Sequence, residues 1–197
     1  MKAVLTTLGV IAGIGLFFGL WIMGSYNSMV AGDERVETAW AQVDSAYQRR
    51  FDLIPNLVGS VQGILTQEQE IFSEIAEART KYAGSREGTR EEQVEAYGQY
   101  ESVVGRLMLI MENYPQLRSY AQVQSLMDEL AGTENRINVE RNRYNEEVRV
   151  WNTDIRRFPR NMLASSFGFE TKVRFEAEEG AESAPSVQLN ATVDTEN

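Results

Sequence analysis

Charged side chains supply most of the chemistry available to this sequence, because its 197 residues include neither histidine nor cysteine. Without histidine, a Ser-His-Asp triad and a di-metal site of the Glu-x-x-His type are both impossible. Without cysteine there is no thiol nucleophile, disulfide or zinc–thiolate site. The lysines, at positions 2, 81 and 172, form no catalytic constellation. The sequence therefore predicts no catalytic residue, no cofactor and no metal, and an enzyme is the least favoured class.

Two acidic runs are the candidate oxygen ligands for a divalent cation. Glu70, Glu74 and Glu77 recur at spacings of four and three, which places them on one face of a helix. A second run, at residues 91–95, falls at a predicted helix start, where negative charge is favourable. Runs of this kind are most often solvated faces, and we expect no metal at either.

Glu134 and Arg141 are the most informative charges, because they stand where a helical repeat requires apolar side chains. Buried charges need partners. These two lie seven residues apart, about 10.5 Å along a helix, which is too far for a direct pair. If the first and last helices of the domain are antiparallel, with facing residue numbers summing to about 183, Arg49 faces Glu134. In the same register, Asp44 lies near Arg141.

Two interpretations of these charges stay open. In the first, an ionic layer between helices sets their register. Its candidate members are Asp44, Arg49, Arg50, Asp52, Glu134 and Arg141. In the second, both seam charges reach from the edge of the seam into water. A double-mutant cycle on Arg49 and Glu134 that showed no coupling would exclude the layer.

Pro55 marks a candidate partner site within a long apolar repeat. Proline removes a backbone donor and kinks or breaks a helix. The flanking Asp52 and Asn56 are predicted to bond the backbone groups that the proline frees. The functional alternative is a partner groove at the kink, in which replacing either residue with alanine weakens partner capture without unfolding the bundle.

The elements that must position these side chains are predicted to be helices. Apolar residues recur every three or four positions over residues 36–82, which predicts one long helix over about 26–82, kinked at Pro55. A break into two helices is the alternative. Two candidate core aromatics, Trp40 and Trp151, lie on the predicted seams.

Two further helices are indicated by their start and stop signals. Thr89 and Glu92 have the spacing of a capping box, and the helix that they open must end near residue 113, before Pro115. A second capping box at Ser119 and Gln122 opens a helix that runs to about residue 157. The short connections favour an all-α fold, an antiparallel up-and-down helical bundle with long helices.

Residues 3–23 carry no charge and are long enough to span the ~30 Å hydrocarbon core of a membrane. Trp21 and Tyr26 are interfacial markers at its end, and the stretch is longer than a cleaved signal peptide needs. A retained single-pass anchor is therefore predicted. Lys2 in the short N-terminal tail favours a bundle on the extracytoplasmic (periplasmic) side.

The chain divides into four predicted parts. They are a membrane anchor (1–24), a helical bundle (25–158), an extended aromatic segment packed on the bundle (159–176) and an acidic disordered tail (177–197). The formal charge of −10 argues against nucleic acid as a partner.

Several long motifs in this chain resemble the signature of the LemA family. They are AWAQVD (39–44), QRR (48–50), DLIPNLV (52–58), ENYPQL (112–117), and the LMDEL, TENRI and RNRYN stretches within 126–145. The resemblance covers roughly residues 20–180, with a departure at Gly59, where an acidic residue is expected, and a looser match from Phe158 onward. It implies an N-terminal anchor, an antiparallel bundle and no established activity. It also implies a partner such as a membrane protease or another envelope protein.

Two functions follow from these expectations. The first is a membrane-anchored, non-enzymatic interaction module that holds a partner protein at the membrane. The alternative is a structural envelope scaffold that assembles with copies of itself. A homo-oligomer of this kind needs a second apolar face, for which Leu53, Val58, Leu65 and Leu109 are the candidates.

Overall fold

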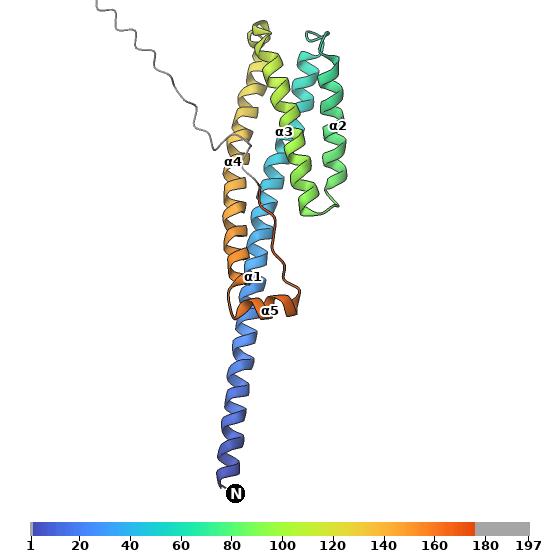
Figure 1. The fold of residues 1–197 in the computed structure, drawn as a ribbon. Helices are drawn as coiled ribbons and strands as arrows, with labels where there is room; N and C mark the ends of the chain where they lie inside the picture. The colour runs from blue at the N-terminus through green and yellow to red at the C-terminus, as the bar shows by residue number, and fades with distance from the viewer. Residues whose placement is uncertain (1, 176–197) are drawn as a thin grey trace, which may run out of the picture.

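The computed structural model describes residues 2–175 and places them in an antiparallel helical bundle on a long N-terminal helix (Figure 1). The elements in chain order are α1 (Lys2–Val61), α2 (Gln69–Ser85), α3 (Arg90–Glu112), the 3-10 helix η1 (Pro115–Ser119), α4 (Ala121–Arg156) and α5 (Arg160–Phe167). Within the described range there is no strand. The predicted all-α, up-and-down bundle is confirmed.

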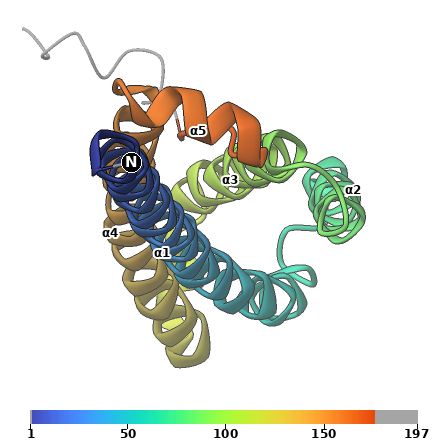
Figure 2. The same cartoon turned by 90° about the horizontal axis from the view of Figure 1, so that it is seen from below.

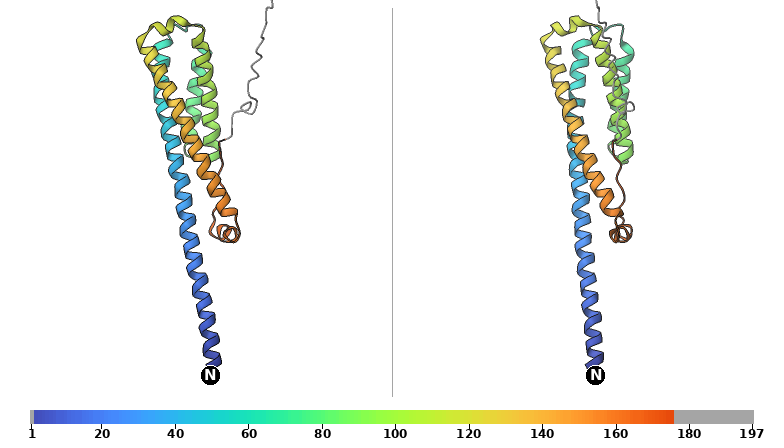
Figure 3. Two further views of the ribbon diagram at one scale, coloured as in Figure 1. Left: turned by 90° about the vertical axis from the view of Figure 1, so that its left-hand side faces the viewer. Right: turned by 60° about the vertical axis from the view of Figure 1, so that its left-hand side comes forward.

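α1 carries both the predicted anchor and the first helix of the bundle without interruption. Its N-terminal part stands clear of all other elements (Figure 3). An 18-residue window there has a mean hydropathy of 2.2 and no buried residue, so α1 is long and apolar enough to cross a membrane. No break in the helix accompanies the predicted boundary at residues 24–25.

The predicted single helix over 26–82 is wrong, and so is the position of its expected interruption. Pro55 lies inside α1, which continues to Val61. The chain then turns over residues 62–68 and returns as α2. The Val61 carbonyl accepts bonds from the N–H groups of Ile64 and Leu65, both at 2.9 Å, and Leu65 is fully buried in the turn. The apolar repeat persists beyond the turn because α2 packs its own apolar face on the same core.

Of the two predicted capping boxes, the first is confirmed and the second is wrong. At the start of α3, Thr89 and Glu92 form the expected capping box, and Asn113 is the C-terminal cap. At the start of α4, Tyr120 is the cap residue and forms no side-chain capping bond. The predicted cap Ser119 instead donates its hydroxyl to the Gln116 carbonyl, at 2.6 Å, because residues 115–119 form η1.

The bundle consists of two closely packed helix pairs, α1 with α4 and α2 with α3 (Figure 2). Gly32 permits the close approach of α1 to α4, because a Cβ there would lie 3.0 Å from the Trp151 ring. Arg35 and Glu147 pair at 3.5 Å one turn further along. Facing residue numbers sum to 182 or 183 at these positions, so the predicted antiparallel register is confirmed.

An aromatic cluster around Trp40 joins the two helix pairs. Its ring stacks on Tyr97 of α3 at 5.6 Å and on Phe175 at 5.7 Å, and meets Tyr144 of α4 edge-on at 5.2 Å. Trp40 and Trp151 are both buried, as predicted.

The segment after α4 differs from the predicted extended conformation. Residues 160–167 form α5, which ends at Gly168 in the left-handed conformation, with φ of 76°. Only residues 169–175 run extended along the bundle, where Phe175 is 7% exposed. Helix formation allows Ala164 and Leu163 to pack against the end of the bundle. The predicted disordered tail, 177–197, lies outside the described residues.

Candidate functional site

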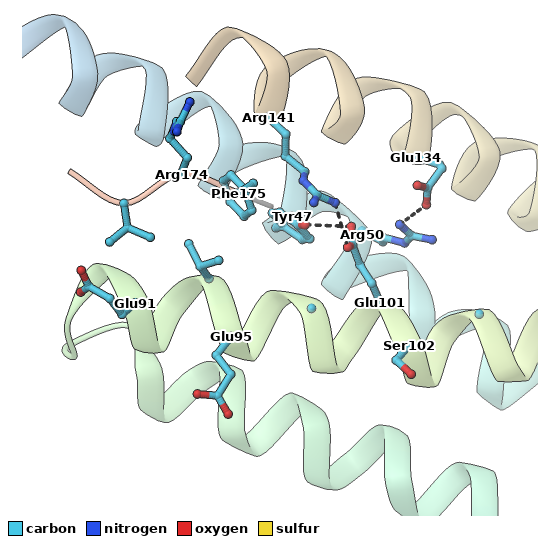
Figure 4. A pocket seen from close by; sticks show the side chains of 14 residues that line it. Tyr47, Arg50, Glu91, Glu95, Glu101, Ser102, Glu134, Arg141, Arg174 and Phe175 are labelled. Atoms are coloured by element: carbon cyan, nitrogen blue, oxygen red, sulfur yellow. Dashed lines mark hydrogen bonds and ion pairs between the residues drawn. The ribbon is translucent and has the colours of Figure 1, made fainter. Parts of the chain in front are cut away.

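A cleft of about 780 Å³ lies between α3 and α4, with α1 behind it and residues 173–175 at one end (Figure 4). Small residues open its α3 wall: Gly98 and Gly105 have nothing within 4 Å of an added Cβ. Its other lining residues are Tyr47, Arg50, Glu91, Val94, Glu95, Glu101, Ser102, Glu134, Arg141, Val173, Arg174 and Phe175. The cleft is therefore walled by both helix pairs and contains charges of both signs.

Arg50 is the most deeply buried charge in the cleft. Its side chain is 8% exposed and forms an ion pair with Glu134 across the α1–α4 interface. The Nε atom is buried without a hydrogen-bond acceptor among the described residues. A buried donor without an acceptor is costly. The Arg50 Nε–H is therefore a hydrogen-bond donor to which a ligand in the cleft could supply the acceptor.

Glu101 of α3 is the second centre of charge. It accepts a hydrogen bond from the Tyr47 hydroxyl at 2.8 Å, and its carboxylate lies 3.1 Å from Arg141. Burial raises the pKa of Glu101, and the hydrogen bond from Tyr47 and the charge of Arg141 offset only part of that effect. Burial likewise raises the pKa of Tyr47, and the Glu101 charge adds to it. Three helices thus meet in one polar network.

Of the residues predicted to form an ionic layer, Arg50 and Glu134 pair with each other across α1 and α4. Arg49, Asp44 and Arg141 form ion pairs with residues outside the predicted set. Glu134 pairs with Arg50 rather than Arg49, and Arg49 contacts Glu129 at 2.7 Å on the surface. Adjacent residues point about 100° apart on a helix. Burial of the α1 face that carries Tyr47 therefore brings Arg50 inward and turns Arg49 outward.

Asp44 and Arg141 do not pair, although the predicted register placed them together. Asp44 accepts hydrogen bonds from the hydroxyls of Tyr97 at 2.8 Å and Tyr82 at 3.2 Å, and contacts Arg86 at 3.4 Å. It thus faces α2 and α3, while Arg141 turns to Glu101. Burial raises the pKa of Tyr82 to about 12, and the Asp44 charge contributes to that shift.

Asp52 and Asn56 lie apart from this network. Both are exposed, and neither lines the cleft. The Asn56 side chain donates to the Asp52 carbonyl at 3.4 Å, which is a long local bond. Pro55 has no N–H to donate to the carbonyl of Phe51, and the Asn56 side chain bonds the next carbonyl along the chain. The capping of backbone groups freed by Pro55 stays a prediction.

Two asparagines of α4, missed by the sequence analysis, hold the extended segment. Asn145 binds both the N–H and the carbonyl of Phe175, at 2.8 and 2.9 Å. Asn152 does the same for Lys172, with both bonds at 2.8 Å. Seven residues of a helix and three residues of an extended chain both span about 10 Å. Asn145 and Asn152 are therefore as far apart on α4 as Phe175 and Lys172 are on the extended segment. The heptad spacing of asparagines was the available signal.

Charge pairs fix the same segment to α1. The Lys172 ammonium lies 2.9 Å from Asp33 and 3.2 Å from Glu37, and Glu37 also pairs with Arg90 at 2.6 Å. Burial raises the pKa of Glu37, but the positive charges of Arg90 and Lys172 outweigh it, so the net pKa is lowered.

Glu37 should therefore stabilise the fold in a pH-dependent manner. Its carboxyl is more acidic in the folded state than the ordinary value of 4.5. The stabilisation is present above pH 4.5 and is lost as the pH falls through the lowered folded-state pKa. We expect the difference in unfolding free energy between the natural chain and Glu37→Gln to shrink at acidic pH in denaturant titrations. A difference that stayed constant with pH would contradict this assignment.

The side chains that line the cleft form hydrogen bonds and ion pairs with one another. No group of three or more acidic residues that could hold a metal ion occurs within residues 2–175. Of the acidic run at 70–77, Glu74 forms an ion pair with Arg106 of α3.

Comparisons with known proteins identify a matching family and several similar proteins. The model of the LemA family matches residues 39–189. Magnetosome protein MamQ 2 of Paramagnetospirillum magneticum is 27% identical, over 88% of this chain and 71% of the relative. Magnetosome protein MamQ of Magnetospirillum gryphiswaldense is 26% identical, over 82% of this chain and 68% of the relative. Protein LemA of Metamycoplasma hominis is 24% identical, over 84% of this chain and 75% of the relative.

Proposed function

The chain belongs to the LemA family, and we propose that it is a membrane-anchored, non-enzymatic interaction module that holds a partner protein at the membrane. The observation that carries this proposal is the unused donor in the cleft. The Arg50 side chain is only 8% exposed, and its Nε–H lacks an acceptor among the described residues. An acceptor supplied by a bound partner would offset that cost.

The extended segment indicates what kind of partner structure the cleft can accept. Asn145 and Asn152 hold an extended backbone by its N–H and carbonyl groups. Asn138 continues this row one heptad nearer the turn between α3 and α4; it is exposed and donates to Glu134 at 3.2 Å. An extended segment of a partner entering beside Phe175 would meet Asn138 and then Arg50. Main-chain recognition of this kind is a common mode of peptide binding.

The location of the module rests on α1. A membrane helix at the N-terminus, followed directly by the bundle, is the arrangement of a single-pass protein. Lys2 in the short tail supports a bundle on the extracytoplasmic side. A membrane protease or another envelope protein would be accessible there.

A self-assembling scaffold has less support in the structure. Of the four residues proposed for a second apolar face, Leu53 and Leu65 are buried in the core and Val58 is half-buried. Leu109 is 62% exposed but stands without the other three. These positions therefore give no continuous apolar strip for lateral assembly.

Site-specific crosslinking of the full chain in its native membranes tests the proposal. A photocrosslinker replaces Ser102 in the cleft or, as a control, the exposed Leu109 on the same helix. We expect position 102 alone to form a crosslink to a different protein. Gly98→Phe, which fills the cleft, should abolish that crosslink, whereas Gly132→Phe, at an exposed helical glycine outside the cleft, should leave it.

Two outcomes would overturn the proposal. Crosslinks only between copies of this chain would favour the scaffold. A crosslink at position 102 that survived Gly98→Phe would show that the partner does not enter the cleft. Circular dichroism on each variant establishes that the helices remain folded.

A further inference from the structure

α5 lies crosswise at the end of the bundle from which the bare part of α1 emerges (Figures 1 and 3). The C-terminal end of α5 lies beside Tyr26 of α1. The centroid of the Tyr26 ring is 5.0 Å from that of Phe167 and 5.9 Å from that of Phe169. Tyr26 is three residues, about 4.5 Å, beyond Met23, the last residue of the predicted membrane span. If that stretch crosses a bilayer, α5 stands at the height of the lipid headgroups.

Large apolar side chains are exposed at this end of the bundle. Phe158 is 80% exposed, Met162 62% and Phe167 44%. The opposite side of α5 packs inward through Ala164, which is 3% exposed, and the half-buried Leu163. Met162 of α5 and Phe158, two residues before α5, are therefore exposed at the level where a bilayer surface would begin.

The same short stretch is locally basic in an acidic protein. Residues 155–169 contain Arg156, Arg157 and Arg160 and no acidic residue, although the chain as a whole carries a formal charge of −10. Arg160 pairs with Asp154, whereas Arg156 and Arg157 are exposed and form no ion pair with any described residue. They line a hollow of about 430 Å³ together with Arg149, Asn152, Thr153 and Arg174.

We propose that residues 156–167, the membrane-proximal patch, dock on the surface of the same bilayer that α1 spans. Phe158 and Met162 enter the interfacial region, and Arg156 and Arg157 bind the phosphates of anionic phospholipids. Apolar side chains beside basic ones are the composition of interfacial helices. The inference rests on the anchoring role proposed for α1, and does not require a partner in the cleft.

The lack of cysteine allows this contact to be measured at single sites in the full chain. Met162→Cys carries a fluorophore in the patch, and Val139→Cys, 55% exposed on α4, is the matched control. Ile14→Cys, 53% exposed in the uncharged stretch, reports insertion of the anchor. Each labelled chain is reconstituted into vesicles of phosphatidylcholine with or without phosphatidylglycerol. Quenching by nitroxide-bearing lipids is then compared with quenching by iodide in the water.

We expect lipid quenching at positions 14 and 162 but not at 139, with stronger quenching at 162 when phosphatidylglycerol is present. Arg156→Gln or Arg157→Gln should lower the ratio of docked to undocked patch in these vesicles by about fivefold per arginine. Arg136→Gln, an exposed arginine of α4 far from the patch, should have no effect.

The outcomes separate the patch from the anchor. If position 14 is quenched by lipid and position 162 behaves like 139, the patch does not dock, while the anchor stands. If position 14 is not quenched, α1 does not insert and both proposals fall. If position 162 is shielded from both quenchers, a protein rather than lipid covers the patch, and the lipid assignment is wrong.

Discussion

Replacing Trp40 with alanine should lower the free energy of unfolding by about 3–5 kcal/mol. Its ring contacts Tyr97, Tyr144 and Phe175, and the Arg90 guanidinium lies 4.0 Å from the ring centroid. Removing the indole leaves a cavity where α3, α4 and the extended segment meet α1. In a domain of this size the midpoint of thermal unfolding should fall by about 10 °C. Calorimetry of the full chain in detergent micelles measures the change.

Phe158→Ala is the matched control for Trp40→Ala, because it also removes an aromatic ring but from a side chain that is 80% exposed. In micelles its effect on unfolding of the bundle should lie within about 0.5 kcal/mol. A similar loss of stability in the two variants, or a Trp40→Ala effect below about 1 kcal/mol, would show that the aromatic cluster does not hold the two helix pairs together.

Glu101→Ala should cost about 3 kcal/mol, which is the lower end of the range for breaking a buried ion pair. The variant removes the acceptor of the Tyr47 hydroxyl and the carboxylate that contacts Arg141. Both members of the ion pair are largely buried, with side chains 16% and 18% exposed, so water replaces these contacts poorly. Denaturant titration followed by circular dichroism gives the value.

Glu95→Ala on the same helix is the control for Glu101→Ala. Glu95 also lines the cleft, but it is exposed, and its described contact is a hydrogen bond from Gln99. Its loss should change stability by no more than about 0.5 kcal/mol. Equal effects of the two substitutions would mean that the Glu101 network does not contribute to the fold beyond an ordinary surface charge.

The helices and their register were predictable because they depend on periodicity along the chain. The α3 capping box and the antiparallel pairing of α1 with α4 were both obtained from spacing alone. The turn at residues 62–68 was not, because the apolar repeat continues through it and Pro55 suggested a stronger break nearby. A proline disfavours a helix locally, but packing of α1 on α4 keeps the helix intact through Pro55.

The site was only partly predictable because its contacts depend on the direction of each side chain. The sequence indicated that Glu134 needs a basic partner on the first helix, but a register estimate could not distinguish Arg49 from Arg50. Glu101 was not predicted as a site residue, because the sequence of its helix contains several polar residues and nothing in their spacing distinguishes Glu101 from the others. Its role arises only when Tyr47 and Arg141 converge on it from two other helices.

The continuity of α1 determines how far from the bilayer this protein can act. Arg50 is 27 residues beyond Met23 in one unbroken helix, which corresponds to about 40 Å along its axis. The helix is therefore a spacer of fixed length, with no flexible joint between the span and the cleft. A partner that binds in the cleft, as proposed, would be held about 40 Å along this axis from the end of the span. Any rotation or tilt of the membrane-spanning part of α1 would also move the cleft, because both belong to one continuous helix.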